Sequence, residues 1–219
     1  MKYSKIPSAT ITRLSRYSRA LEELEAQGYT VVSSEKLARQ CAVNSAQIRK
    51  DLAYFGEFGV RGVGYVVKEL LFQIKRILGL NKTWNLAIIG MGNLGFALID
   101  HSNFPKQGYF FVAAFDIDPQ KIGRKLSQGF EISPMSDLER VAAERKVEIA
   151  VITTPASKAQ EVADQVVKTS IRGILNFAPV QLHVPEGYPV HHIDFTVKLD
   201  RLAYMMGNIA TEPDDKKTS

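Results

Sequence analysis

The chain has 219 residues, of which 45% are hydrophobic and 23% are charged, and its formal net charge at pH 7 is +5. This length suffices for one large domain or two small ones, and the single cysteine, Cys41, excludes an internal disulfide. No apolar stretch reaches the roughly 20 residues that span a bilayer, and the first residues lack the apolar core of a signal peptide, so we expect a cytoplasmic protein with no membrane segment.

Charge is distributed unevenly along the chain. Residues 1–82 contain 14 Lys and Arg against 7 Asp and Glu, whereas the remainder contains 14 against 16. A basic first part followed by a slightly acidic remainder is typical of a protein in which one domain meets nucleic-acid phosphates. A charged surface exposed to water would give the same count, so the charge count alone does not distinguish this surface from a nucleic-acid-binding domain.

Apolar residues at helical spacing predict a first helix over residues 10–27, and Gly28 is a natural C-terminal stop. A short β-prone piece follows. Ser33 and Ser34 are good N-cap residues for a second, short helix that ends near Ala42.

Asn44 and Gln47 have the spacing of a capping box, in which the Asn44 side chain accepts from the Gln47 backbone and the Gln47 side chain reaches back. A third helix then runs to about Phe55, with Ile48 and Leu52 facing the core. Two helices joined by a tight turn indicate a helix-turn-helix whose second helix enters the major groove. The residues left to contact bases and phosphates are Ser45, Gln47, Arg49 and Lys50.

Residues 56–65 contain four glycines around Arg61 and indicate a β-hairpin wing, with Arg61 at its tip suited to a minor groove. Short helices and glycine hairpins also occur in many folds with solvated polar residues, and this alternative stays open. A connecting helix over residues 67–78 ends at Gly79, and a domain boundary is expected near Asn81.

From Trp84 onward, β-prone and helical segments alternate, which predicts a doubly wound parallel sheet of the Rossmann type. We expect strands at residues 85–89, 109–115, 148–153 and 173–177, and helices at residues 93–101, 136–145 and 157–168.

A glycine-rich turn follows the first of these strands and opens a helix, as a dinucleotide-binding turn does. Gly90 permits the tight turn, Gly92 lets the backbone approach a pyrophosphate, and Gly95 allows close helix packing, while the helix N-terminus attracts phosphate. The full motif is Gly90-Met91-Gly92-Asn93-Leu94-Gly95.

Asp116 ends the next strand and is suited to accept from the ribose hydroxyls of an adenosine. Its charge disfavours a 2′-phosphate and favours NAD(H) over NADP(H), although Lys121 and Arg124 lie nearby in the sequence. Asp116 as a simple turn residue before Pro119 is the alternative.

Two short loops at the same edge of the sheet are suited to line an adenine or nicotinamide pocket, and their candidate residues are Thr154, Pro155, Asn176 and Ala178. They offer no acid or base. The four histidines, His101, His183, His191 and His192, have no carboxylate partner at suggestive spacing. Binding without turnover is therefore favoured, and no metal is expected; an NAD-dependent oxidoreductase with an N-terminal interaction module is the alternative.

A last amphipathic helix begins after Asp194 as N-cap and carries Phe195 on its apolar face. Since the sheet is already complete, this helix is suited to hold a dimer, which a helix-turn-helix needs to read two half-sites. Packing against its own sheet is the alternative. Residues 211–219 are polar and are expected to form a frayed tail.

Together these segments resemble the Rex family of bacterial redox-sensing transcriptional repressors over nearly the whole chain. The resemblance rests on Ser33-Ser34-Glu35, on Gln47-Ile48-Arg49-Lys50-Asp51-Leu52 with Tyr54-Phe55-Gly56, on Arg61-Gly62-Val63-Gly64-Tyr65, on the glycine turn, on Phe115-Asp116-Ile117-Asp118-Pro119 with Lys121-Ile122-Gly123, and on Gly173-Ile174-Leu175-Asn176-Phe177-Ala178-Pro179.

The resemblance implies a homodimer whose winged helices bind inverted-repeat operators and whose Rossmann domains bind NAD(H), with NADH disfavouring DNA binding. It implies a winged-helix domain at residues 1–80, a Rossmann domain at 81–193 and a helix swapped between subunits at 194–210. Arg13 and Tyr54 join the DNA-binding candidates.

The resemblance also implies a switch, in which Arg19 pairs with Asp194 in the DNA-binding form and Phe195 lies near the nicotinamide. Where some members place a tyrosine that competes for the aspartate, this chain has His101, which suggests pH sensitivity. Two rivals remain open: sensing of another nucleotide such as CoA, and thiol sensing by Cys41, for which a buried structural role is the simpler interpretation.

Overall fold

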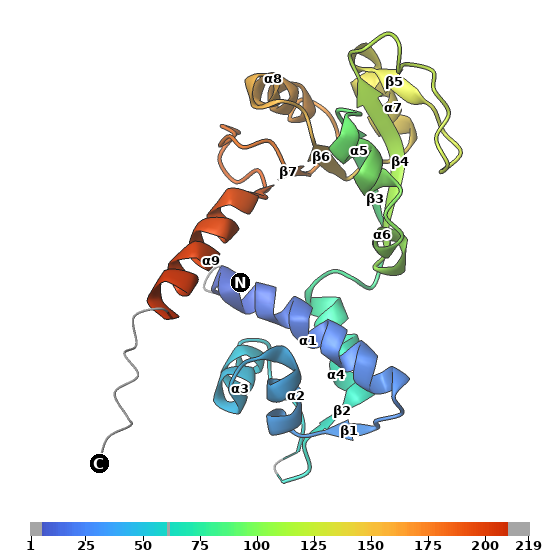
Figure 1. The fold of residues 1–219 in the computed structure, drawn as a ribbon. Helices are drawn as coiled ribbons and strands as arrows, with labels where there is room; N and C mark the ends of the chain where they lie inside the picture. The colour runs from blue at the N-terminus through green and yellow to red at the C-terminus, as the bar shows by residue number, and fades with distance from the viewer. Residues whose placement is uncertain (1–5, 61, 210–219) are drawn as a thin grey trace. The chain divides into compact units, whose positions relative to one another are not determined.

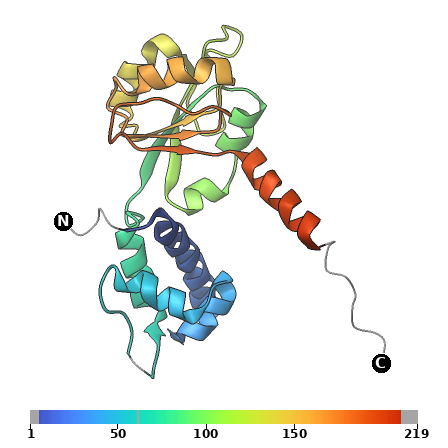
Figure 2. The same ribbon diagram turned by 90° about the vertical axis from the view of Figure 1, so that its left-hand side faces the viewer.

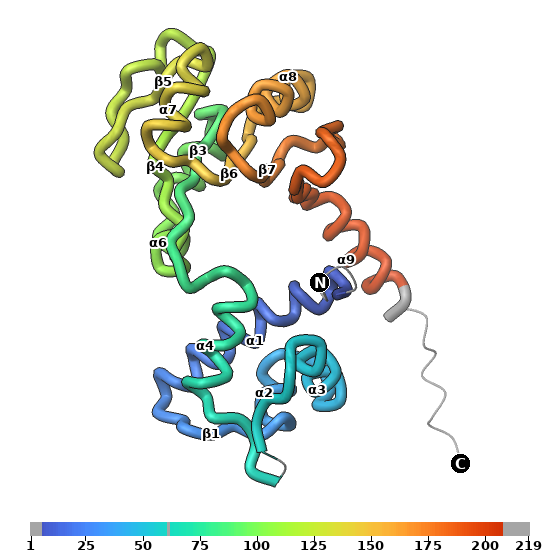
Figure 3. Tube along the Cα trace, turned by 180° about the vertical axis from the view of Figure 1, so that it is seen from behind, coloured from blue at the N-terminus to red at the C-terminus, as the bar shows by residue number. Residues whose placement is uncertain are grey.

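The computed structural model describes residues 6–60 and 62–209. The chain divides into two compact units, residues 1–83 and 84–219, joined by one short connection after α4 (Figures 1 and 3). Two expectations, for Arg61 and for the tail at 211–219, lie outside the described residues.

The first unit is a helical domain with a small antiparallel ribbon (Figure 1). In the ribbon, Val31 pairs with Val66 and Val32 with Tyr65. The elements are α1 (Ser8–Ala26), β1 (Val31–Val32), α2 (Ser34–Cys41), α3 (Ser45–Ala53), β2 (Tyr65–Val66) and α4 (Val67–Ile77).

The core of this unit is built from the apolar stripes of its four helices, as the helical spacing predicts. Ile48 and Leu52 of α3 are buried, as expected. The other large side chains with no more than 2% exposure include Leu14, Tyr17, Leu21 and Leu24 of α1, Leu37 of α2, and Leu70 and Ile74 of α4.

Side-chain caps set the limits of α2 and α3. Ser33 Oγ accepts from Lys36 N at 3.2 Å, and Asn44 Oδ1 accepts from Gln47 N at 2.7 Å, which confirms both predicted N-caps. Between them Ala42 ends α2 in the left-handed conformation, at φ 50°. The second half of the predicted capping box is wrong, because the Gln47 side chain does not reach back but donates to Asp51.

The second unit contains a six-stranded sheet in the order β5-β4-β3-β6-β7-β8, in which every neighbouring pair is parallel. This order is that of a doubly wound Rossmann sheet. The strands are β3 (Trp84–Ile89), β4 (Tyr109–Asp116), β5 (Ile132–Pro134), β6 (Ile149–Ile152), β7 (Gly173–Asn176) and β8 (Val190–His192). The helices are α5 (Asn93–Ile99), α6 (Asn103–Lys106), a 3-10 turn η2 (Met135–Asp137), α7 (Leu138–Glu144), α8 (Ala156–Val166) and α9 (Phe195–Ile209).

Helices cover both faces of the sheet (Figure 2), and alternate strand residues form two separate cores. Ala87 and Ile89 of β3 belong to the core that α7 and α8 complete. Leu86 and Ile88 belong to the core that contains Ile99 of α5. Burial on both faces explains why the central strands are continuous apolar runs.

Helix α9 begins at a confirmed N-cap, since Asp194 Oδ1 accepts from Thr196 N at 2.8 Å and from Val197 N at 3.3 Å. All its side chains from Phe195 to Gly207 are exposed. The alternative that α9 packs against its own sheet is therefore wrong for the described chain.

Candidate functional site

The glycine turn adopts the geometry that its sequence predicts. Gly90 has φ +99°, and a Cβ there would lie 2.9 Å from Thr154 Cγ2. A Cβ on Gly95 would collide with the carbonyl oxygen of Gly90, so the close approach of α5 to the turn requires glycine.

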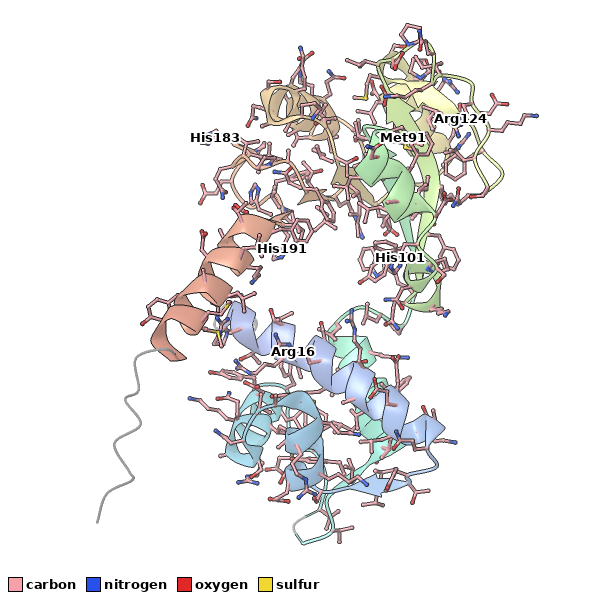
Figure 4. The ribbon with its side chains drawn as sticks, viewed as in Figure 1. Arg16, Met91, His101, Arg124, His183 and His191 are labelled. Atoms are coloured by element: carbon pink, nitrogen blue, oxygen red, sulfur yellow. The ribbon has the colours of Figure 1, made fainter. Side chains whose placement is uncertain are left out.

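Gly92 differs from the other two glycines of the motif. Its φ is −85°, and a Cβ built there meets nothing within 4 Å. The backbone at Gly92 therefore faces open space at the amino end of α5, where the first N–H groups of the helix are free of intrahelical partners. Met91, labelled beside this helix in Figure 4, is fully buried beneath the turn.

Asp116 ties the end of β4 to the glycine turn. Its Oδ2 accepts from Met91 N at 2.7 Å, and its Oδ1 accepts from Asp118 N at 2.9 Å. Lys121 Nζ lies 3.2 Å from Oδ2. Burial opposes ionisation, but these hydrogen bonds outweigh it and lower the pKa of Asp116 below its ordinary value. The carboxylate is thus a turn residue, the alternative weighed above, and it also faces a cleft.

That cleft, of about 800 Å³, lies where β3, β4 and β6 end. Sequence reasoning identified five of its lining residues, Gly90, Gly92, Asp116, Thr154 and Pro155. The buried Thr154 Oγ1 has no hydrogen-bond partner among the described residues. A buried hydroxyl without a partner is costly, so a polar ligand in the cleft would satisfy it. The cleft also includes Lys158 and Glu161 of α8, which the sequence pattern did not single out because they resemble ordinary surface charges.

The other predicted cofactor residues lie outside this lining. Asn93 and Leu94 are exposed on the first turn of α5. Asn176 is fully buried: its Nδ2 donates to Val180 O at 2.8 Å and its Oδ1 accepts from Ala178 N at 2.9 Å, which fixes the loop after β7. The contacts of these residues with a cofactor stay predictions.

Phe195, at the start of α9, lies beside Phe177, with 6.3 Å between ring centroids, and its side chain is 61% exposed. His101 is exposed after α5; its ring packs edge-on against Phe104, and its Nδ1 accepts from Asn103 N at 3.3 Å. Arg19 is exposed on α1. The pairing of Arg19 with Asp194 joins residues of different units and stays a prediction.

The exposed side of α3 presents the predicted DNA-binding residues. Lys50 and Arg49 are exposed, and Tyr54 after the helix is 39% exposed. Arg49 Nη1 donates to Ser34 Oγ at 2.9 Å and lies 3.6 Å from Glu35 Oε1, so α2 holds its guanidinium in place. Ser45 is half-buried on the first turn.

In the first unit, sequence reasoning missed Asp51. It is fully buried on α3 and accepts from Arg13 through Nε at 2.6 Å and Nη2 at 2.6 Å. The predicted DNA-binding residue Arg13 therefore directs its charge into the contact between α1 and α3. The partners are about forty residues apart in sequence, so local spacing gives no signal for this cluster.

The wing is a narrow turn in which Val60 and Gly64 form an isolated antiparallel bridge. Gly64 has φ +107°, and a Cβ there would lie 2.5 Å from Val32 O, so the wing can lie this close to β1 only with glycine. Val60 and Val63 are 64% and 60% exposed.

Residues 6–60 and 62–209 bring together no group of three or more His, Cys, Asp and Glu that could hold a metal ion. Three of the histidines, His101, His183 and His191, lie on different segments (Figure 4). Across the same residues, no helix has the length and apolar character to cross a bilayer.

Comparison with known proteins agrees with both units. Residues 5–53 match the family described as "Putative DNA-binding protein N-terminus", and residues 81–180 match the family described as "CoA binding domain". The redox-sensing transcriptional repressor Rex of Syntrophobacter fumaroxidans is 62% identical over 93% of this chain and 97% of its own length. Rex of Carboxydothermus hydrogenoformans is 52% identical over 93% and 98%.

Solved structures give the same result. RSP, described as a Rex-family repressor, in complex with β-NAD+ and operator DNA superposes with a TM-score of 0.87, at 36% identity over 94% of each chain. RSP in complex with β-NADH superposes with a TM-score of 0.84, at 35% identity over 94% of this chain and 96% of that one.

A helix-turn-helix unit followed by a Rossmann unit with a glycine-turn cleft defines a ligand-responsive transcription regulator. At 62% identity to a curated relative over nearly its whole length, the chain belongs to the Rex family of redox-sensing transcriptional repressors. The predicted family and fold are confirmed, and the oxidoreductase alternative is set aside because the family is one of repressors.

Proposed function

We propose that this protein represses transcription by binding an inverted-repeat operator as a homodimer, and that NADH binding releases it. The proposal rests on the combination of two features in one chain. The first unit presents Arg49 and Lys50 on a recognition helix, and the second unit contains a glycine turn that faces an open cleft. RSP, a relative with the same fold, is bound to NAD+ and operator DNA in one structure and to NADH in another. This role also places the protein in the cytoplasm, with the chromosome.

The proposed parts follow the chain. Residues 1–80 bind DNA, residues 81–193 bind NAD(H), and residues 194–210 hold the dimer. Gly92 receives the pyrophosphate, since the space beside it is open. Asp116 receives the adenosine ribose through the lone pairs that the turn leaves free, and Thr154 offers its unpaired hydroxyl.

The nicotinamide end discriminates between the two redox forms. Oxidised nicotinamide is a planar cation, whereas the reduced ring is neutral. Phe195 and Phe177 offer an apolar surface at the start of α9. An apolar neighbour favours the neutral ring, because a cation loses more hydration on burial than a neutral ring does.

Helix α9 supplies the dimer contact. Seven of its large apolar side chains are at least half exposed, namely Phe195, Val197, Leu199, Leu202, Tyr204, Met205 and Met206. An apolar surface of this size is costly in water, and a second copy of the chain is the proposed partner that covers it. Two copies also supply the two recognition helices that a palindromic operator needs.

Release from DNA involves Arg19, Asp194 and His101. We propose that Arg19 pairs with Asp194 in the DNA-binding form and that His101 competes for the carboxylate when NADH is bound. A protonated imidazole competes better than a neutral one, so release by NADH should depend on pH. His101→Ala should remove that dependence, measured as the NADH concentration that halves operator binding at each pH. An unchanged pH profile in His101→Ala would exclude the histidine from the switch.

Fluorescence anisotropy of a labelled duplex tests the central proposal. A duplex selected from a randomised pool by the full-length protein should stay bound in NAD+ and be released by NADH, at fixed salt because phosphate contacts make affinity salt-dependent. CoA is the competitor to include, because residues 81–180 match a CoA-binding family. Failure to select any duplex, or release by CoA alone, would overturn the proposal.

A further inference from the structure

Asp51 is the most heavily bonded carboxylate of the first unit. Its side chain is fully buried between α1 and α3. Besides the two bonds from Arg13, Oδ1 accepts from Thr10 Oγ1 at 3.1 Å and Oδ2 accepts from Tyr17 Oη at 2.8 Å. The remaining donor is Gln47 Nε2, one turn earlier on α3, at 2.9 Å from Oδ1.

This carboxylate is an acceptor only. Burial opposes its ionisation, but the hydrogen bonds, that of Arg13 first, outweigh burial and hold the pKa of Asp51 below its ordinary value. An ionised carboxylate has no proton to donate. A side-chain amide that contacts it must therefore turn its NH₂ group inward, as Gln47 does.

The contact with Asp51 also constrains the other end of the Gln47 amide. Gln47 is half-buried on the first turn of α3, one helical turn before the exposed Lys50. With Nε2 bonded to Asp51, the carbonyl oxygen of the amide is left for another partner, and one N–H remains beside it. Without the carboxylate the amide could present either end, since its two orientations have the same shape.

We propose that Asp51 is a specificity-determining residue, which fixes the Gln47 amide so that its carbonyl oxygen reads the major groove. This inference rests on the proposed operator binding. Only adenine and cytosine present an amino donor in the major groove, whereas guanine and thymine present acceptors. A fixed outward carbonyl therefore accepts adenine or cytosine and rejects guanine, and adenine N7 also matches the remaining N–H. Arg13 acts through Asp51 and is a positioning residue.

Base preference measured on the full-length protein tests the proposal. A duplex is selected by the wild-type protein from a pool with a randomised centre, in the presence of NAD+. Single base pairs of that duplex are then changed. At the position read by Gln47, identified by its loss of preference in Gln47→Met, the wild-type protein should favour adenine over guanine roughly tenfold, the discrimination of one good side-chain contact.

Asp51→Asn keeps the shape of the side chain but can donate as well as accept, so Gln47 becomes free to turn. The adenine preference should fall to about twofold at that position and stay unchanged elsewhere. The slope of log affinity against log salt should also stay unchanged, because no phosphate contact is lost. A purely structural role would weaken all sequences alike.

Two comparisons complete the design. In α8, Gln160 Nε2 donates to Asp164 Oδ1 at 2.7 Å, with the same one-turn spacing. Asp164→Asn is the matched control and should leave base preference as in the wild type. In a Gln47→Met background, Asp51→Asn should cause no further change at the read position, because the two residues act as a unit.

The outcomes separate the two proposals. Selection of no duplex by the wild-type protein would contradict operator binding itself. Selection of a duplex, with Asp51→Asn retaining the full adenine preference, would overturn only the role of Asp51. Thermal unfolding checks that Asp51→Asn folds. If it does not fold, Thr10→Ser and Arg13→Lys are used instead, because they weaken the cluster while they keep Asp51. An unchanged adenine preference in both folded variants would count against the proposal.

Discussion

At the residue scale, two glycines of one motif differ in whether the fold tolerates a side chain in their place. Gly95→Ala should destabilise the second unit by about 1 to 3 kcal/mol, because its Cβ collides with the Gly90 carbonyl. Gly92→Ala should leave stability within about 0.5 kcal/mol, because its φ suits alanine and its surroundings are open. It should nevertheless lose NADH affinity, since the added methyl would occupy the space proposed for the pyrophosphate.

Thermal unfolding and NADH fluorescence titration separate the two variants. We expect Gly92→Ala to fold stably and to bind NADH poorly, and Gly95→Ala to be the less stable variant. Tight NADH binding by Gly92→Ala would show that the pyrophosphate does not lie against this residue.

Cys41 is a buried free thiol. Burial raises the pKa of the Cys41 thiol to about 11, and its Sγ donates to Arg16 O at 3.9 Å. At neutral pH its thiolate population should be roughly a hundredfold below that of an ordinary cysteine. Alkylation by iodoacetamide, followed by mass spectrometry, should be at least that much slower in the folded protein than in urea. Equal alkylation rates in the folded protein and in urea would support thiol sensing by Cys41.

Residue-scale prediction from the sequence succeeded where the partner is close along the chain. The caps by Ser33 and Asn44 follow from three-residue spacing. The turn made by Asp116 with Met91 and the cluster around Asp51 join distant residues, so no local pattern could reveal them.

At the element scale, the apolar strands β3, β4, β6 and β7 were predicted, whereas β5, β8 and α6 were missed. Strands β5 and β8 have three residues each, too few for a recognisable period, and His191 and His192 make β8 polar. Helix α6 has four residues and contains Pro105. The short strands form because the neighbouring strands β4 and β7 give them hydrogen-bond partners. Those partners are defined by the tertiary structure and not by the local sequence.

Helix α9 offers the clearest test at this scale. Leu202→Glu should weaken the proposed dimer at least tenfold, since burial of a leucine contributes about 1.5 to 3 kcal/mol and the contact occurs twice by symmetry. Arg201→Glu is a control with a larger change of charge, next to Leu202 in the chain but turned away from Phe195, Leu199 and Met206 by the helical spacing. Sedimentation velocity over a range of concentrations gives the association constant, and a Leu202→Glu protein that remains as dimeric as the control would refute the assignment.

At the whole-molecule scale, the coupling of two ligands has a quantitative consequence. If NADH lowers operator affinity by a factor, the operator must lower NADH affinity by the same factor, and we expect about 5- to 150-fold. NADH fluorescence titrations with and without saturating duplex measure it. Lys50→Ala should weaken DNA binding, and because Lys50 is not among the residues that line the cleft, the variant should leave NADH affinity of the free protein unchanged. Full NADH affinity in the presence of bound duplex would mean that the two sites are independent.

The number and type of the two units were predictable from the sequence, because basic charge precedes residue 82 and strand-helix alternation follows Trp84. The arrangement of the two subunits in the proposed dimer was not, since the exposed apolar side chains of α9 indicate a contact without its geometry.

The order of the parts along the chain also governs how a newly made molecule acquires its activities. The first unit is mainly helical with local contacts, so it can fold while the rest is still being synthesised, whereas the parallel sheet must wait until β8 has emerged. A growing chain would thus carry a finished DNA-binding unit before it carries a sensor. Under the proposed assembly this stage is harmless: α9 is made after both, so a half-finished chain cannot pair and holds only one half-site weakly.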